Sequence, residues 1–489
     1  MAVTVLPVAL AELALNRAQL AGASYADVRL VERLLETVCT RDGRPGGISR
    51  NTSRGFGVRV LVDGAWGFAS SSRLTEPEVE RVVTEAIAIA RASRPSQLVP
   101  VSLGEPLRLV GRYETPLRED PFAVPVEEKL ATLMAAEAEM RAVPGVRVTS
   151  GSIGAQREHK LFASTEGSRI EQVITETGCG IEATAVGASE LQTRSYPNSF
   201  GRQQATVGYE LVRETDLPGN ARRIAEEAVA LLTAPPCPAG ETTLILDPTQ
   251  LALQIHESIG HAIELDRVMG YEAAYAGTSF LAPAMRDSFE YAAPIVTVTA
   301  DATLPGGLGT FGWDDEGVPA QRVPIIEQGR FKGFLSCRET AARLGLPSGG
   351  MARADGWGRI PMVRMTNVNL EPGAGSFEDL LADTEDGIYM QTNRSWSIDD
   401  KRVNFQFGAQ IAWEVKRGKL GRMLRNPTYT GITPRFWAGC DFICGPEAWQ
   451  IWGTPNCGKG QPLQVAHVGH GASPARFRGV HVGVARSDA

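Results

Sequence analysis

The chain has 489 residues, 43% hydrophobic and 21% charged, so it has the composition of an ordinary globular protein and the length for two or three domains. Its net charge of −7 is small and its basic residues are dispersed, which argues against a nucleic-acid-binding surface. No apolar run is long enough to span a membrane, and no basic segment precedes the first apolar residues as in a signal peptide. Because the seven cysteines are scattered, we expect no disulfide framework and a cytoplasmic location.

The first half of the chain alternates helical and strand-like patterns. Apolar periodicity predicts helices over residues 10–21, 71–94, 126–142 and 217–232. It predicts strands over residues 25–40, where one strand leads into another, then 55–69 and 145–186, the last broken at Thr165-Glu-Gly. Asp63-Gly64 predicts a hairpin turn, and Thr75 with Glu78 has the spacing of a capping box. Residues 95–125 are rich in proline and polar side chains and are expected to wrap the surface.

A proline cluster at residues 234–240 cannot continue a helix and predicts a domain boundary. We therefore expect an α+β protein with an N-terminal α/β domain over residues 1–234 and a β-rich C-terminal domain over residues 235–489. After a strand at 241–247 and a helix at 251–266, the second half reads mainly as strands. These are expected over residues 295–299, 330–335, 362–370 and 403–415, and in the last stretch to Val484.

The most informative motif is His256-Glu257-Ser-Ile-Gly-His261, which holds two of the six histidines. Neutral imidazoles are common ligands of transition metals, and a carboxylate beside them that does not bind the metal can take a proton from metal-bound water. This residue set is typical of a zinc hydrolase.

The spacing of the two histidines departs from the familiar H-E-x-x-H of zinc proteases by one extra residue. On an ideal helix, residues five apart diverge by about 140°, so a straight helix could not chelate a metal with both imidazoles. We therefore expect a π-bulge near Gly260 that rotates His261 back toward His256. The alternative is that the two histidines are ordinary helix residues on different faces.

A catalytic zinc usually takes three protein ligands, so one more must come from elsewhere. Cys457, in a glycine-rich turn, is one candidate; Glu264, Asp266, His467 and His470 are others. Two rival interpretations of this region are a phosphate-binding loop over residues 453–460 and a structural zinc knuckle. The loop lacks the hydroxyl that binds magnesium, and the knuckle, built from Cys440, Cys444, Cys457, His467 and His470, has an unusually tight histidine pair.

Taken together, the motifs resemble the TldD/PmbA family of metalloproteases, and specifically the TldD branch, which keeps H-E-x-x-x-H. The resemblance covers nearly the whole chain. In the first half it rests on Ala26-Asp-Val-Arg, Gly55-Phe-Gly-Val-Arg-Val and Gly67-Phe-Ala-Ser-Ser. In the second half it rests on the histidine motif, Asp314-Asp-Glu-Gly-Val-Pro-Ala-Gln, Gly333-Phe-Leu, Arg364-Met-Thr-Asn-Val, Glu371-Pro-Gly, Gly387-Ile-Tyr and Cys457-Gly-Lys.

The resemblance implies that His256, His261 and Cys457 bind Zn²⁺ and that Glu257 is the general base. It also implies a barrel-like C-terminal domain, hydrolysis of peptide bonds in unfolded or extended polypeptides, and a homodimer or a heterodimer with a PmbA-like subunit. Glu264 could orient a ligand from behind. The oxyanion donor is not identified; Arg364 and Asn367 are candidates, and the alternative for both is a structural role.

Two other functions fit the same motifs. The chain could be a non-catalytic or chaperone-like subunit of a TldD/PmbA-type assembly, or a zinc amidase that acts on small molecules. Turnover that depends on Glu257 would exclude the first, and cleavage of extended peptides would exclude the second. No nucleic-acid or membrane partner is expected.

Overall fold

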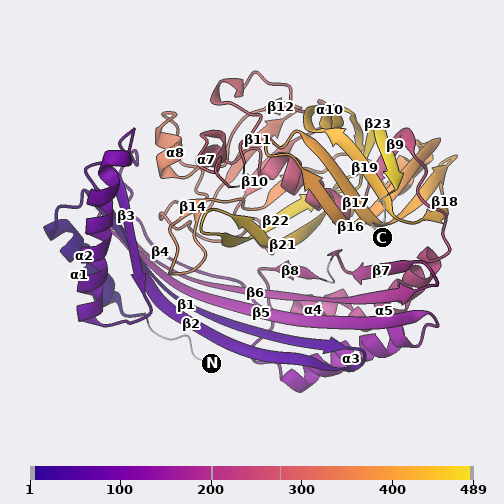
Figure 1. The fold of residues 1–489 in the computed structure, drawn as a ribbon, viewed down its shortest axis with the longest axis horizontal. Helices are drawn as coiled ribbons and strands as arrows, with labels where there is room; N and C mark the ends of the chain where they lie inside the picture. Colours follow the sequence, from indigo (N-terminus) through magenta and orange to yellow (C-terminus); the bar gives the residue numbers. More distant parts are fainter. Residues whose placement is uncertain (1–5, 200–201, 276, 485–489) are drawn as a thin grey trace.

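The computed structural model describes residues 6–199, 202–275 and 277–484 (Figure 1). The N-terminal half forms one eight-stranded sheet with the order β3-β2-β1-β5-β6-β4, and β7 and β8 pair with β6. Its strands are β1 (Tyr25–Arg41), β2 (Arg44–Val62), β3 (Ala65–Ser71), β4 (Val110–Glu114), β5 (Val146–Ser164), β6 (Arg169–Val186), β7 (Leu191–Tyr196) and β8 (Gln203–Ala205). Its helices are α1 (Val8–Leu20), α2 (Glu76–Ser93), α3 (Val126–Arg141), α4 (Glu210–Thr215) and α5 (Leu217–Leu231).

The two faces of this sheet differ in chemistry because side chains alternate along each strand. On β1, Ala26, Val28 and Leu30 belong to an apolar core that includes residues of α1 and α2. Further along, Val38 lies on the same face and packs with residues of α3 and α5. The long strands arc beneath the C-terminal half of the chain, with α3 and α5 on the far side (Figure 1). The opposite face is polar and meets the C-terminal half.

The hairpin turn between β2 and β3 is confirmed. Asp63 and Gly64 both have positive φ, 50° and 77°, as the tight turn of a two-residue hairpin requires. The predicted pair of strands in residues 25–40 is wrong, because β1 runs unbroken from Tyr25 to Arg41 with a bulge at Cys39/Thr40. The capping box is also wrong: Thr75 is the N-cap residue of α2 but makes no capping bond, and Glu78 accepts from Ser71 and Arg81 instead.

One strand was missed inside the segment expected to wrap the surface. β4 runs parallel to β6 and extends the sheet by one strand. Its sequence alternates without a long apolar run, so the neighbouring strand, not its own pattern, determines its conformation.

The C-terminal half is built around a closed barrel. The strands β16, β9, β23, β19 and β17 pair in that order, and β16 also pairs with β17, which closes the ring. The strands of this half are β9 (Gly240–Leu246), β10 (Val298–Asp301), β11 (Arg322–Glu327), β12 (Arg330–Phe331), β13 (Ala352–Arg353), β14 (Met362–Val363), β15 (Val368–Leu370), β16 (Asp386–Ile398), β17 (Asn404–Lys416), β18 (Lys419–Leu424), β19 (Pro427–Ile432), β20 (Cys440–Ile443), β21 (Gln450–Lys459), β22 (Gln464–Ala472) and β23 (Ala475–Val484). Its α-helices are α6 (Pro248–Ile255), α7 (Leu265–Val268), α8 (Arg338–Ala342), α9 (Phe377–Ala382) and α10 (Thr433–Ala438). The predicted α+β fold with a barrel-like C-terminal part is therefore confirmed.

Several predicted strands of this half are shorter than expected. The first begins at Val298 rather than at residue 295, the second is only Arg330–Phe331, and the third is split into β14 and β15. Apolar side chains in these segments are buried outside a regular strand, for example Phe334, and Leu335, which forms only an isolated bridge with Glu264. Hydrophobic pattern alone does not separate a buried loop from a buried strand.

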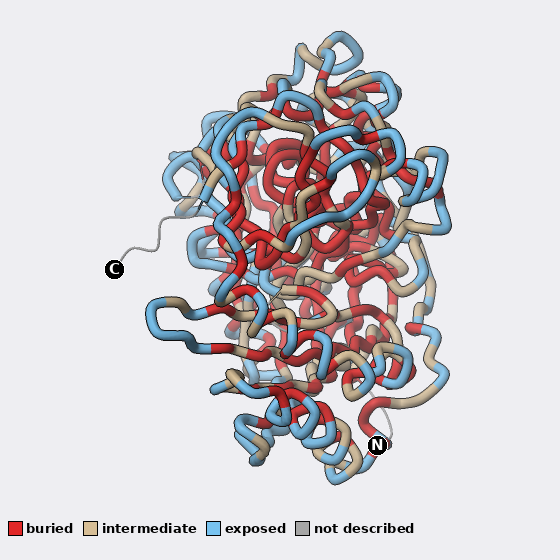
Figure 2. The backbone as a smooth tube through the Cα atoms, turned by 90° about the vertical axis from the view of Figure 1, so that its right-hand side faces the viewer, coloured by how far each residue is buried: buried red, intermediate tan, exposed pale blue. Residues whose placement is uncertain are grey.

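The largest apolar core lies in the C-terminal half and includes Leu251, Ile255, Ile259, Ala262 and Ile263, the residues on which the helix prediction rested. Figure 2 shows buried segments concentrated in the interior and exposed segments mainly at the periphery. Among the described residues, no helix combines the length and apolar character that a membrane crossing requires.

Buried ion pairs connect the polar face of the sheet to the C-terminal half. Arg59 of β2 binds Asp27 of β1 at 2.6 Å and Glu316 at 3.0 Å, and Lys160 of β5 binds Asp315 at 2.6 Å. The motif Asp314-Asp-Glu-Gly thus joins the two halves. The domain boundary at residues 234/235 remains a prediction.

Close packing between β3 and α2 leads to a stability prediction. A Cβ atom at Gly67 would collide with the Ala86 carbonyl oxygen and lie 2.6 Å from the Ala90 nitrogen. We expect Gly67→Ala to lower the free energy of unfolding by about 3 kcal/mol, as overpacking does. At Gly47 a Cβ would meet nothing within 4 Å, so Gly47→Ala is the control and should change stability by less than about 0.5 kcal/mol. Equal denaturation midpoints for the two variants would contradict this packing.

Candidate metal centre

The histidine motif lies where an α-helix changes to a π-turn. The Asp247 side chain caps α6 by accepting from the Thr249 nitrogen at 2.9 Å. The helix then widens over His256–Gly260, and the His261 nitrogen donates to the His256 carbonyl, five residues back, at 3.1 Å. A Cβ at Gly260 would collide with Met365, which explains the glycine. The predicted bulge is confirmed, whereas the single helix over 251–266 is wrong, because α7 is a separate turn.

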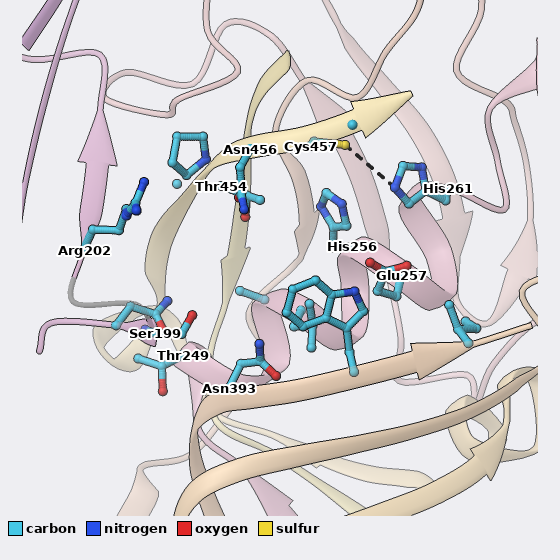
Figure 3. A pocket seen from close by; sticks show the side chains of 18 of the residues that line it. Ser199, Arg202, Thr249, His256, Glu257, His261, Asn393, Thr454, Asn456 and Cys457 are labelled. Atoms are coloured by element: carbon cyan, nitrogen blue, oxygen red, sulfur yellow. Dashed lines mark hydrogen bonds between the residues drawn. The ribbon is translucent and has the colours of Figure 1, made fainter. Parts of the chain in front are cut away.

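The structure brings His256, His261 and Cys457 together. One potential ligand atom from each residue lies within 4.8 Å of the others, and all three residues are buried. The Cys457 Sγ atom is 3.7 Å from His261 Nε2 (Figure 3). Cys457 comes from β21, whose pairing with β22 shifts between Thr454 and Cys457. Such a bulge re-aims the following side chains.

Hydrogen bonds determine which nitrogen of each imidazole is available. His470 Nδ1 is 3.1 Å from the Val368 carbonyl oxygen, to which it can only donate. Its Nε2 therefore accepts from His256 Nδ1 at 2.7 Å, which leaves the lone pair of His256 on Nε2. His261 Nδ1 lies 2.9 Å from Glu264 and donates to that carboxylate, so its lone pair is on the Nε2 that faces Cys457. These partners present both Nε2 atoms as donors to a metal.

The electrostatic environment favours the forms that bind metals. Burial lowers the pKa of His256 and of His261, so both imidazoles are neutral at physiological pH. Burial alone would raise the pKa of the Cys457 thiol, but its pKa is lowered, and the nearby Arg364 guanidinium is the largest cause of the lowering. Two neutral imidazoles and a thiolate are a donor set that suits zinc, so the residues present fit the metal that the motif implies.

Charged residues behind the cluster hold it in place. Burial would raise the pKa of Glu264, but Lys459 and His261 hold it well below its usual range, so Glu264 is a carboxylate. Lys459 lies 3.3 Å from Glu264 and 2.7 Å from Asp266. Because Lys459 is two residues after Cys457 on β21, both side chains lie on the same face of the strand. The Cys457-Gly-Lys motif thus ties its strand to the segment after His261.

The remaining candidates for the third ligand and for the oxyanion donor lie outside the His-His-Cys cluster. His470 contacts His256 from behind, while His467 is directed to Glu176, 2.6 Å away. Arg364 donates to the Cys457 carbonyl at 2.5 Å, and Asn367 donates to the Asp301 carbonyl at 2.7 Å. Neither Arg364 nor Asn367 lines the cavity beside the histidines.

The two rival interpretations are wrong. Residues 453–459 lie in β21, and a second strand rather than a helix follows, so no phosphate loop forms. In the described part of the chain, the only group of three or more potential metal ligands is His256, His261 and Cys457. Cys440 and Cys444 make sulfur contacts with backbone carbonyls instead, and burial raises the pKa of each to about 12.

A cavity of about 630 Å³ opens beside the cluster. Glu257 lines it, and its Oε2 accepts from Arg402 Nη1 at 2.8 Å. Arg402 was missed from the sequence: it lies in a polar loop between β16 and β17, and no local pattern indicates that this loop reaches the helix. One wall of the cavity is the segment Gly453–Gly458 of β21, and Ser199, Arg202, Thr249 and Asn393 also line it (Figure 3).

A buried His-His-Cys cluster beside a carboxylate that lines a cavity is the arrangement of a candidate metalloenzyme. The sequence matches three family profiles: PmbA/TldA metallopeptidase domain 1 over residues 26–90, the central domain over 119–233 and the C-terminal domain over 239–481. The chain belongs to the TldD/PmbA metallopeptidase family, as the sequence motifs predicted.

Relatives extend over most of the chain. A metalloprotease from Methanocaldococcus jannaschii is 32% identical over 410 residues, which cover 83% of this chain and 86% of that protein. A zinc metalloprotease TldD homolog from Saccharolobus solfataricus is 25% identical over 425 residues, covering 86% and 88%. The crystal structure of TldE from Thermococcus kodakarensis has a TM-score of 0.76 at 16% identity, covers 97% of this chain and 100% of that chain, and shows the same fold.

Proposed function

We propose that this protein is a zinc-dependent metalloprotease of TldD type that hydrolyses peptide bonds in unfolded or extended polypeptides. The observation that carries the proposal is the convergence of two neutral imidazoles and a thiolate next to Glu257, at the wall of a cavity of about 630 Å³. His256, His261 and Cys457 would hold the metal. The name of the Saccharolobus relative supports zinc as that metal.

Glu257 is the proposed general base. When bound, zinc supplies Lewis acidity to water and to the substrate carbonyl. Glu257 takes the proton from the attacking water and later gives it to the leaving amine. Arg402 holds one carboxylate oxygen at 2.8 Å and so fixes the orientation of the group. Glu264, His470 and Arg364 act behind the ligands, through His261, His256 and the backbone of Cys457.

The shape of the site supports an extended substrate. The wall formed by Gly453–Gly458 presents strand backbone beside the cluster. A peptide in an extended conformation can bind to such a strand through main-chain hydrogen bonds, which require no particular side chains. This mode of binding suits a protease that takes unfolded chains of varied sequence.

Cleavage assays on the zinc-loaded protein test the proposal. We expect hydrolysis of denatured proteins and of extended peptides, and much slower hydrolysis of small aryl amides. Preferential cleavage of the small amides would support the amidase function instead. A zinc-loaded protein that cleaves neither would support the non-catalytic subunit.

The hydrogen bond between His470 and His256 should affect the affinity of the site for zinc. We expect His470→Ala to weaken zinc binding by 10- to 100-fold, the usual cost of removing a residue that orients a ligand. His467→Ala is the matched control, because His467 bonds to Glu176 and does not contact the cluster; its zinc affinity should equal that of the wild type. Competition with a chromogenic chelator measures both affinities. A larger loss in the His467 variant would contradict the assigned hydrogen bonds.

We further propose that the protein forms a homodimer or a heterodimer with a PmbA-like subunit. The fold shared with TldE supports this proposal. A cytoplasmic location is part of the same proposal, and the seven free cysteines support it.

A further inference from the structure

A second cavity, of about 420 Å³, adjoins the first. It lies between the polar face of the N-terminal sheet, at Arg33 and Lys160, and the C-terminal half, at Arg353 and His467. The two cavities share Arg202 and Pro455 as lining residues. The cavities are therefore neighbours at these two residues, so a substrate bound in the first can extend toward the second.

The carboxylates that line the second cavity already have partners. Arg33 binds Glu158 and Asp355, and Lys160 binds Asp315. The remaining carboxylates also have partners. Glu36 pairs with Lys129, and Glu176 accepts from Gln204 and contacts His467. Asp314 accepts from the backbone nitrogens of Glu316, Val318 and Ala352. Four of the carboxylates are thus paired with lysine or arginine, whereas Asp314 and Glu176 are held by backbone, amide and imidazole groups.

Three arginines of this cavity, Arg202, Arg353 and Arg364, make no ion pair with a carboxylate of the described residues, and Arg364 donates instead to the carbonyl oxygens of Gln464 and Cys457. Arg353 Nη1 donates only to the carbonyl oxygens of Met365, at 3.0 Å, and His467, at 2.6 Å. Arg202 is exposed at the junction of the two cavities and has no hydrogen bond to a described residue. Burial lowers the pKa of Arg353, and the neighbouring charge of Arg364 adds to this effect. Arg202 and Arg353 therefore bring positive charge to the cavity wall with no carboxylate bound directly to either, although Asp315, Glu176 and Glu158 act on Arg353 from a greater distance.

We propose that the second cavity binds a carboxylate of the peptide substrate, with Arg202 and Arg353 as its cationic partners. The carboxylate is the C-terminus of the substrate or an acidic side chain near it. This inference rests on the proposed function and adds to it an anchoring site beyond the backbone contacts of the first cavity. In Figure 3, Arg202 lies on the opposite side of the first cavity from His261, so the anchor is separated from the reacting bond.

Peptide binding tests this inference without requiring turnover. The probe is an N-terminally fluorescein-labelled octapeptide without acidic side chains, made with a free C-terminal carboxyl or with a C-terminal amide. Anisotropy titrations use the Glu257→Gln protein, so that no cleavage occurs. We expect the free acid to bind roughly tenfold more tightly than the amide, because a hydrogen bond between two charged groups is stronger than one to a neutral amide.

Substitutions of Arg202 test whether this residue causes the difference in affinity between the free acid and the amide. Arg202→Gln should bind acid and amide equally, and Arg202→Lys should restore part of the difference by restoring the charge. Arg73→Gln, which removes an exposed arginine that lines neither cavity, should keep the full difference. An amide peptide with one glutamate placed at successive positions shows whether a side chain can replace the C-terminus, and recovery of affinity at one position supports the same site.

Equal binding of acid and amide by the Glu257→Gln protein, or no binding of either, would overturn the inference. The inference would also fail if Arg202→Gln and Arg73→Gln altered the difference in affinity between acid and amide peptides by the same amount. Selective binding of the acid by a protein that cleaves no peptide would leave the inference standing and reject the proposed protease function, so the two failures can be told apart.

Discussion

Replacing Glu257 by alanine should reduce peptide hydrolysis by about 10³-fold or more while the protein keeps its zinc, because general acid-base catalysis typically contributes 10²- to 10⁴-fold. The Glu257 side chain lies in the cavity and is not part of the His-His-Cys cluster. Zinc content by elemental mass spectrometry and kcat/KM on an extended peptide measure the two quantities on the same preparation.

Glu257→Gln is the matched control for this experiment. Its amide oxygen can still accept the hydrogen bond that Arg402 now donates to Glu257 at 2.8 Å, but the amide cannot take a proton. Both variants should therefore be inactive to a similar degree. If Glu257→Gln keeps most of the activity, the role of this residue is to hold Arg402, and the base must be another group.

Replacing Cys457 by serine should reduce the zinc content from about one ion per chain to a small fraction of that, and hydrolysis should fall with it. A serine hydroxyl does not ionise near neutral pH, whereas the surroundings of Cys457 favour its thiolate. The comparison measures zinc in purified wild-type and variant proteins after the same dialysis.

Cys444→Ser is the control for the cysteine substitution. Cys444 is also buried, but its sulfur contacts the Ser376 carbonyl oxygen and lies outside the cluster. This variant should keep its zinc. Unchanged zinc in the Cys457→Ser protein would contradict the proposed ligand set and make Glu264 or His470, the residues behind the imidazoles, the next candidates for the third ligand.

Much of the fold could be predicted because it depends on local pattern. The helices of the N-terminal half and the turn at Asp63-Gly64 follow from residues within a few positions of one another. The strands β4 and β11 depend on partners elsewhere in the chain, so their sequences did not predict them. The bulge at Gly260 was predictable for a different reason: the two histidines could not face one metal without it.

The residues of the candidate site also fall into those that a local motif predicts and those that depend on distant partners. His256, Glu257 and His261 are visible in six residues of sequence. Arg402 and the orienting contacts of His470 and Lys459 come from loops and strands far along the chain, and only tertiary packing brings them to the helix. The sequence supplied Cys457 as one of several candidates, and the family resemblance, not spacing, singled it out.

The separation between the ligands has a consequence for synthesis of the protein. His261 and Cys457 are 196 positions apart, so a growing chain displays the histidine helix long before the ribosome adds the cysteine. β8 of the N-terminal sheet also bonds to β21, through Gln203 and the backbone of Ile451 and Gly453. Full coordination of the proposed zinc ion would therefore have to wait until both halves have folded around each other. A nascent or truncated chain carries an incomplete centre, so the proposed protease activity would be absent until synthesis and folding of the chain are complete.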